Sequence, residues 1–381
     1  MPLSSDTPSV PSPAPAQLAR TWRLGLTPQL REHALLALVL SVHTIVAYAL
    51  AAYHGLHGAI HISLYGEHLM VMLLAAGTAF VTMWLLRIVF VLRPAQPLAF
   101  ALNASRRFQW KRRLTAALPS LLLLAVLISV YSSWKVMMPA IAPFSWDQRF
   151  HLWDLALHGG KAPWEWLHPL LGQPLVTSLI NAGYHLWLFV IYFVFLWQAF
   201  ALTRPVLRTQ FMLCFVLLWT LLGNGLATWL SSAGPCYYGL IVGPPDPYGP
   251  LLDYLRSAQG VVPIWALDVQ QLLWNDYQSG ALAVGRGISA MPSLHVATTT
   301  LIFLLACRYG KPAGWAAGIF LGLILIGSVH LAWHYAIDGY LSLVLTLIIW
   351  RLSGAVSRRL HRNTLCRESA SESGTPVLCR L

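Results

Sequence analysis

The chain has 381 residues, of which 57% are hydrophobic and only 10% are charged. This balance excludes an ordinary soluble globular domain, in which about a quarter of the residues carry a charge. The formal net charge is +12. In a chain this apolar we interpret the positive charge as a signal of membrane topology and of attraction to anionic lipid headgroups, with no nucleic acid as partner.

Apolar segments of span length recur along the chain, since about 20 helical residues cross a hydrocarbon core of ~30 Å. The sixth segment is short, so we expect its helix to begin a turn or two before the apolar core. A break near Trp333 separates the last two segments, because one continuous helix would be about twice as long as the bilayer is thick. We predict an all-α fold, a polytopic membrane bundle with about eight spans at 33–53, 68–92, 114–136, 178–202, 210–232, 293–309, 313–333 and 336–356.

Lys and Arg are concentrated in alternate connections between these segments. Basic residues are retained on the cytoplasmic side, so these connections and both chain ends are predicted to be cytoplasmic. The protein is then a multi-pass protein of a plasma or inner membrane, in contact with membrane lipids. The basic groups of this side lie before residue 33, from Arg93 to Arg113, at Arg204 and Arg208, at Arg308 and Lys311, and after the last span.

Two polar motifs fall at the opposite, non-cytoplasmic ends of predicted spans. GSVHLAWHYAIDGY covers 327–340 and GISAMPSLHVA covers 287–297. One inward and outward helical pass separates them, so a helix bundle can bring His295, His334 and Asp338 to the same membrane face.

His334 and Asp338 are four residues apart, which makes them neighbours on one helix face. A carboxylate there can fix the tautomer of the imidazole and leave its other nitrogen basic. Such an imidazole can act as a nucleophile or a general base. An ionisable group beside a span is costly, so Asp338 is a functional candidate. The structural alternative is that Asp338 only caps a helix and His334 only packs at the interface.

The MPSLH motif predicts a phosphate cradle. Pro292 is expected in the first turn of a helix, whose positive end, with its backbone amides and the Ser293 hydroxyl, can hold an anion. His295, one turn in, would lie beside that anion and donate a proton to a leaving oxygen.

MPSLH followed about 40 residues later by HYAID resembles the second and third signature motifs of the type 2 phosphatidic acid phosphatase (PAP2) superfamily. The branch it resembles is that of inositol phosphorylceramide synthases and related phosphotransferases. The resemblance implies a six-helix core with its active site at the outer membrane face. It also implies that His334 attacks phosphorus and becomes phosphorylated, that Asp338 orients it, and that His295 protonates the leaving group, without a metal or other cofactor.

The motifs depart from the superfamily pattern in three places. Leu294 stands where the second motif usually has Gly, as in the synthase-like branch, and Ser328 stands where the third usually has Arg. The first motif, a Lys followed seven residues later by Arg-Pro, is not found. Trp197 occupies the Lys position before Arg204-Pro205, in a loop predicted to be cytoplasmic.

Phosphate binding therefore needs other donors, because phosphate oxygens require cationic or amide partners in the transition state. On the predicted side Arg286 is the first candidate, followed by Arg256 and Lys161, although Arg286 is equally consistent with an ordinary loop residue. His330, one turn before the expected nucleophile, could contact the phosphate or pack behind it.

The chain divides into four regions. Residues 1–32 form a cytoplasmic N-terminal tail predicted to be disordered, and 33–113 form two transmembrane helices with a basic loop. The PAP2-like catalytic core covers 114–356, and 357–381 form a cytoplasmic tail. In the longest outer connection, SSAGPCYYG (231–239) carries Tyr237 and Tyr238, which could line a lipid entrance or simply lie at the interface.

We predict an integral-membrane enzyme that cleaves a phosphoester of a lipid phosphate or phospholipid through phospho-His334. Water as second nucleophile makes it a phosphatase, and a hydroxyl makes it a transferase. The sequence leaves both open, and Leu294 favours transfer of a phosphorylated inositol headgroup by analogy. The sequence carries no signal for the oligomeric state.

Two other functions compete with this prediction. A metal-dependent hydrolase would use His330, His334 and Asp338 as zinc ligands, although ligands from consecutive turns of one helix converge poorly. That hydrolase would also leave the PSLH motif without a role. A transporter or scaffold without chemistry would use the buried His and Asp as a proton relay.

Overall fold

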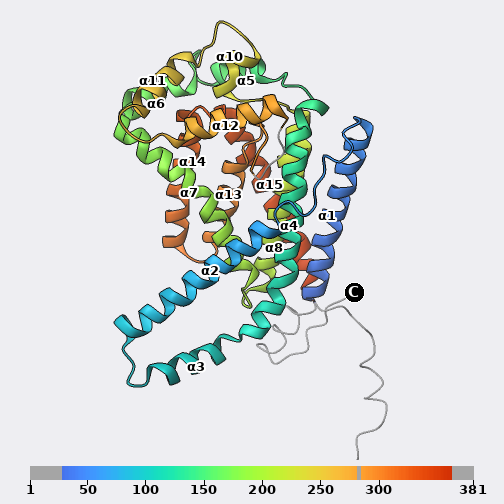
Figure 1. Cartoon of the computed structure of the whole chain (residues 1–381), viewed down its shortest axis with the longest axis vertical. Helices are drawn as coiled ribbons and strands as arrows, with labels where there is room; N and C mark the ends of the chain where they lie inside the picture. Colours follow the sequence, from blue (N-terminus) through green and yellow to red (C-terminus); the bar gives the residue numbers. More distant parts are fainter. Residues whose placement is uncertain (1–27, 281–284, 363–381) are drawn as a thin grey trace, which may run out of the picture.

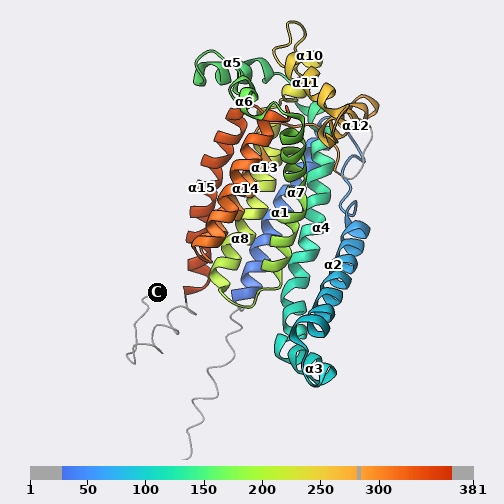
Figure 2. The same cartoon turned by 90° about the vertical axis from the view of Figure 1, so that its left-hand side faces the viewer.

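The computed structural model describes residues 28–280 and 285–362, and this part of the chain contains helices and no strand. Seven of its helices are long and apolar enough to cross a membrane. The prediction of an all-α polytopic bundle is thus confirmed (Figures 1 and 2). The bundle helices are α1 (Pro28–Tyr53), α2 (Gly66–Leu86), α4 (Trp110–Ile141), α7 (Pro174–Ala199), α8 (Pro205–Leu217), α13 (Leu294–Ala306), α14 (Lys311–His330) and α15 (Ala336–Leu360).

Proline and π-helical turns shape the ends of these helices. α7 and α8 each begin with a proline, Pro174 and Pro205, which suits the first helical position because the N–H there has no partner in the helix. Two π-helical turns, Arg87–Leu92 and Leu218–Leu226, continue α2 and α8, and α9 (Ala227–Trp229) follows the second.

The eight predicted segments correspond to the eight bundle helices, and α14 and α15 are separated at residues 331–335, as predicted around Trp333. The prediction for the sixth helix was wrong at its start. α13 begins at Leu294, because the Ser293 hydroxyl accepts a hydrogen bond from the Val296 N–H (3.4 Å) and caps the helix. Pro292 therefore precedes the helix instead of lying in its first turn. The 13-residue α13 is only about 20 Å long and starts among buried residues.

Short helices form a layer across one end of the bundle (Figures 1 and 2). The opposite end carries the connection with α3 (Pro97–Phe108), the α7–α8 and α13–α14 connections, and both ends of the described chain. The basic connections thus gather at the end away from this layer. The helices of the layer are α5 (Asp147–Leu157), α6 (Pro163–Leu171), the 3-10 turn Pro235–Tyr237 with α10 (Tyr238–Ile241), α11 (Gly249–Gln259) and α12 (Trp265–Ser279).

A buried polar cluster joins the first and last helices at the basic end. Arg208 of α8 forms an ion pair with Glu32 of α1 at 2.6 Å. Thr209 contacts the same carboxylate and also His361, whose Nε2 lies 2.9 Å from the hydroxyl oxygen. Glu32, which we had placed in the N-terminal tail, is therefore part of the bundle. The rest of the predicted tails, residues 1–27 and 363–381, lies outside the described residues.

Candidate active site

A cavity of about 370 Å³ lies between α4 and α7, close to the layer of short helices. The two polar motifs meet there, since both His295 and His334 line it and their ring centroids are 5.7 Å apart. Lys135, His185 and Arg286 are the other titratable groups of basic character in its lining. Aromatic residues are prominent in the remaining wall: Tyr65, Tyr131, Tyr184, Trp187, Tyr192, Trp219, Tyr237 and Trp333.

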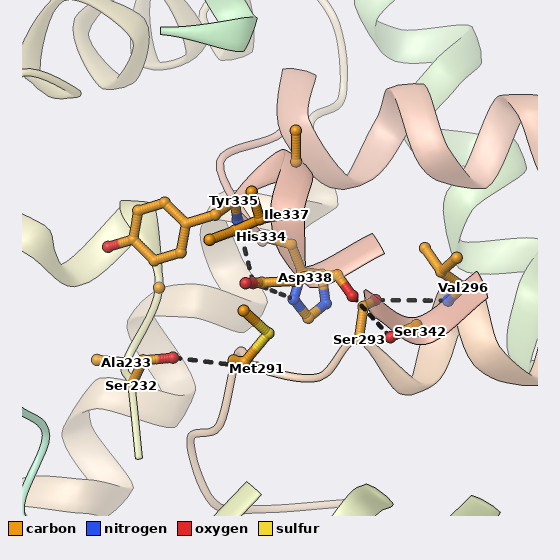
Figure 3. A network of polar contacts seen from close by, with 12 residues as sticks. Ser232, Ala233, Met291, Ser293, Val296, His334, Tyr335, Ile337, Asp338 and Ser342 are labelled. Carbon is orange, nitrogen blue, oxygen red and sulfur yellow. Dashed lines mark hydrogen bonds and ion pairs between the residues drawn. The ribbon is translucent and has the colours of Figure 1, made fainter. Parts of the chain in front are cut away.

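His334 lies in the connection before α15, not on a helix face. Its Nδ1 is 3.3 Å from Oδ2 of Asp338 (Figure 3). The backbone N–H groups of Trp333 and His334 both donate to the Ser328 carbonyl at 3.0 Å, which turns the chain sharply after α14. The predicted contact between His334 and Asp338 is therefore present, but α15 begins only at Ala336 and the contact arises from a turn.

Asp338 serves as both a cap and a partner of His334. It is fully buried in the first turn of α15, where its Oδ2 also accepts the Tyr335 N–H at 3.1 Å. Its Oδ1 has no hydrogen-bond partner among the described residues. The capping role and the orienting role, which the sequence left as alternatives, are compatible in one carboxylate.

The environment of His334 keeps its ring neutral. Burial lowers the pKa of His334 to about 3, and the positive charge of Lys135 acts in the same direction, while a hydrogen bond with the backbone of Ala290 opposes both. A neutral imidazole with one nitrogen directed at a carboxylate has its other nitrogen available as a nucleophile.

His295 is the second residue of α13 and is held between aromatic rings. It stacks on Tyr184, with centroids 4.8 Å apart and an interplanar angle of 24°, and its centroid is 4.1 Å from that of Trp187. Both aromatic residues come from α7. These contacts fix the plane of the imidazole on the wall of the cavity opposite α4.

The structure brings only some of the predicted site residues to the cavity. Ser293 is fully buried and its hydroxyl caps α13, and His330 is fully buried with its Nε2 2.9 Å from the Thr177 hydroxyl; neither lines the cavity. His330 therefore does not converge with His334 and Asp338, and the zinc alternative loses one of its three proposed ligands.

Of the basic residues that the sequence suggested as phosphate ligands, some line the cavity and others do not. Arg286 lines the cavity and forms an ion pair with Asp276 of α12. Arg256 is exposed and pairs with its neighbour Asp253, and neither it nor Lys161 lines the cavity. Of the three basic residues considered for phosphate binding, only Arg286 is in position.

Lys135 is a functional candidate that sequence reasoning missed. It lies in the last two turns of α4, lines the cavity, and is close enough to His295 and His334 to affect both electrostatically. The signal was available, because Lys135 is the only Lys or Arg in the predicted span 114–136. An ionisable residue inside a span is a functional candidate by default.

The SSAGPC segment connects the two motifs through its backbone. Ser232 accepts the Ala290 N–H on its carbonyl (3.0 Å) and the Met291 N–H on its hydroxyl (3.3 Å), as Figure 3 shows for the second bond. The Cys236 N–H donates to the Ala332 carbonyl at 3.0 Å. The segment therefore holds the loop before His295 against the loop before His334.

The aromatic pair after this segment divides between two places. Tyr237 lines the cavity and donates its hydroxyl to the Gln270 carbonyl at 2.8 Å. Tyr238 packs instead against His151 and Tyr248. Of the two, only Tyr237 can contact a molecule bound in the cavity.

Gly234 is the tightest point of this connection. Its φ is 101° and its ψ 168°, a region that side chains rarely adopt, and a Cβ there would lie 2.8 Å from the Trp333 carbonyl oxygen. We expect Gly234→Ala to destabilise the protein by about 1–3 kcal/mol and to lower activity. Thermal unfolding in detergent measures this, with Gly249→Ala as the control, because Gly249 has open space around it. Equal unfolding temperatures for wild type and Gly234→Ala would contradict the expectation.

The fold and the cavity define a multi-pass membrane protein with a histidine and carboxylate site near one end of its bundle. The model of the PAP2 superfamily matches residues 148–352, more than half of the chain, and the chain belongs to this superfamily. This membership supports a phosphatase-type enzyme. No curated protein and no solved structure matches the chain. The match begins inside α5, so α4 and Lys135 lie outside it.

Proposed function

We propose that this protein is a lipid phosphatase or phosphotransferase that works through a phosphohistidine on His334. The observation that carries the proposal is the convergence of the His334–Asp338 pair and His295 on one cavity, with ring centroids of the two histidines 5.7 Å apart. Nucleophile, orienting acid and proton donor are the three groups that transfer of a phosphoryl group through an enzyme nucleophile requires.

In the first step, the His334 nitrogen that faces away from Asp338 attacks phosphorus. A nitrogen–phosphorus bond forms and the bond from phosphorus to the leaving oxygen breaks, while protonated His295 gives its proton to that oxygen. Asp338 stabilises the positive charge that develops on the His334 ring. In the second step, His295 removes a proton from water or an alcohol, whose oxygen attacks phosphorus and releases His334.

Cations in the cavity supply charge for the phosphate oxygens. Lys135 and Arg286 take this role, with the backbone N–H groups at the start of α13. Arg286 is partly neutralised by Asp276, so Lys135 is the main phosphate ligand. In this proposal the catalytic core includes α4.

The cavity wall suits a lipid phosphate with an uncharged headgroup. Its lining contains no Asp or Glu among the described residues, so it offers no ion-pair partner to a cationic headgroup. Ile128, Tyr192 and Trp219 extend an apolar path along α4 and α7, which a lipid tail can follow. Together with Leu294, these features favour a polyol such as phosphoinositol as the transferred group.

The basic end of the bundle is placed on the cytoplasmic side of a plasma or inner membrane, following the distribution of Lys and Arg. The cavity, at the other end, then opens on the periplasmic or extracytoplasmic face. Substrate would be drawn from the outer leaflet.

The experiment uses purified protein in detergent with EDTA and a panel of lipid phosphates and phosphodiesters. We expect turnover without added metal and phosphate on the protein that is acid-labile and alkali-stable, as phosphohistidine is. Adding diacylglycerol, ceramide or inositol as acceptor separates transfer from hydrolysis. Loss of turnover in EDTA with recovery in zinc would favour the metal-dependent hydrolase, and proton-coupled flux in liposomes without phosphate release would favour the transporter.

A further inference from the structure

Two buried carboxylates of α5 reach from the outer layer into the backbone of the site. Asp154 is 1% exposed, and its Oδ2 accepts the Ala336 N–H at 2.8 Å while its Oδ1 accepts the Ile337 N–H at 3.0 Å. These N–H groups belong to the first turn of α15 and have no partner within the helix. Asp154 thus caps α15 in addition to Asp338, although it comes from a helix 182 residues earlier in the chain.

Asp147 lies two turns earlier on the same face of α5. It is also 1% exposed, and its two oxygens accept the N–H groups of Ala233 at 3.0 Å and Gly234 at 2.8 Å. Its Oδ1 accepts the Tyr335 hydroxyl as well, at 2.9 Å. One helix face therefore holds both the SSAGPC segment and the residue that follows His334.

A carboxylate suits this position better than a neutral side chain. The start of α15 carries partial positive charge, and only an ionised carboxylate offers each of two N–H groups its own charged acceptor. The local N-cap, Tyr335, makes no cap hydrogen bond with its side chain. The fixed geometry of residues 335–337 therefore depends on α5 as well as on the local contact of the Tyr335 N–H with Asp338.

We propose that Asp147 and Asp154 are positioning residues, which hold the backbone around His334 so that its free nitrogen points at phosphorus. The inference rests on the proposed role of His334 as nucleophile. Neither carboxylate lines the cavity, so neither would contact the substrate. They act through the peptide groups of residues 233–234 and 335–337.

The first test replaces Asp154 with asparagine, which keeps the size but leaves one acceptor oxygen. We expect the rate of phosphoenzyme formation to fall about 100-fold with little change in KM, because a misplacement of about 1 Å at a reacting group has an effect of that order. Asp253→Asn is the matched control, since Asp253 is 76% exposed on α11, and it should behave as wild type. Thermal unfolding of each variant shows whether the folded fraction is the same.

The pH profile separates positioning from a purely structural role. Burial raises the pKa of Asp154 to about 6, and its two backbone hydrogen bonds act in the opposite direction. The nearby Asp338 carboxylate raises this pKa further, and His158 lowers it. The hydroxyls of Tyr248 and Tyr340 are the other titratable groups near Asp154. Below pH 6 the carboxyl gains a proton and loses one acceptor. The wild-type rate of phosphoenzyme formation should therefore fall as the pH drops through about 6.

The asparagine of Asp154→Asn cannot be protonated near pH 6, so the rate of phosphoenzyme formation in this variant should not fall as the pH drops through that value. Asp147→Asn should form phosphoenzyme slowly at every pH but should retain the fall near pH 6. Unchanged rate and profile in Asp154→Asn would overturn the inference, and so would a loss of thermal stability with a normal rate for the folded fraction. If His334→Ala keeps its activity, the proposed function itself fails, which is a different result.

Discussion

Substitution of His334 by alanine should lower turnover by at least about 10⁴-fold and abolish the phosphorylated protein, because it removes the atom that bonds to phosphorus. Losing one member of a catalytic group that acts as a unit has effects of this size. The measurement is the initial rate in EDTA together with acid-labile phosphate on the protein. The residual rate reflects the cations and His295 alone.

Two further variants make this result specific. His334→Gln keeps most of the side-chain volume in a site that is 6% exposed, so it should fold as wild type and be equally inactive. His57→Ala changes an exposed histidine of the connection after α1 and should retain full activity. A His334→Gln protein that still forms phosphoenzyme would assign the nucleophile to another residue.

Replacing Lys135 with methionine should reduce kcat about 10²- to 10³-fold, the usual effect of removing one donor to a developing negative charge. Methionine fills similar space without the charge, so the cavity stays intact. Lys135→Arg should recover part of the rate, because it restores the charge with a different shape. The kinetics of phosphoenzyme formation against substrate concentration give both kcat and KM.

The control for Lys135 is Lys161→Met. Lys161 lies in the layer of short helices, over the ring of Trp166, and does not line the cavity. It should leave both constants unchanged. If Arg286→Met has the larger effect and Lys135→Met a small one, the ion pair with Asp276 does not prevent Arg286 from serving as the phosphate ligand, and our ranking of the two is reversed.

The fold could be predicted well from the sequence because span length and charge asymmetry are properties of single segments. The break near Trp333 followed from length alone. The start of α13 was misjudged, because Pro292 suits a first helical position in general. Here the Ser293 hydroxyl caps the helix one residue later, so the proline lies outside it.

The contact between residues that are close in the sequence could be predicted. The contacts that depend on packing between distant segments could not. His334 and Asp338 are four residues apart and meet. Helical periodicity left His330 either in contact with the phosphate or packed behind it. The turn at residues 331–335 separates it from His334, and its Nε2 lies against the Thr177 hydroxyl. Lys135 was missed because Arg286, only nine residues before His295, was preferred, whereas Lys135 lies 160 residues before that histidine and only packing brings it to the cavity.

The roles of Asp147 and Asp154 had no signal in the sequence. Both lie on the 11-residue helix α5, DQRFHLWDLAL, whose sequence has no motif that marks either carboxylate. Most of their partners are backbone N–H groups 86 to 183 residues away, and a backbone N–H is present whatever the residue type at its position. Such contacts become visible only when the elements are placed in space.

The buried cluster of Glu32, Arg208, Thr209 and His361 limits how the protein can be shortened. A fragment confined to residues 114–356 contains both polar motifs and Lys135, but it omits Glu32 and His361. Arg208 would then remain in the interior without its carboxylate, and removing one partner of a buried ion pair typically costs 3–5 kcal/mol. We therefore expect that the segment 114–356 does not fold on its own, and that a shortened protein needs α1 and the chain through His361.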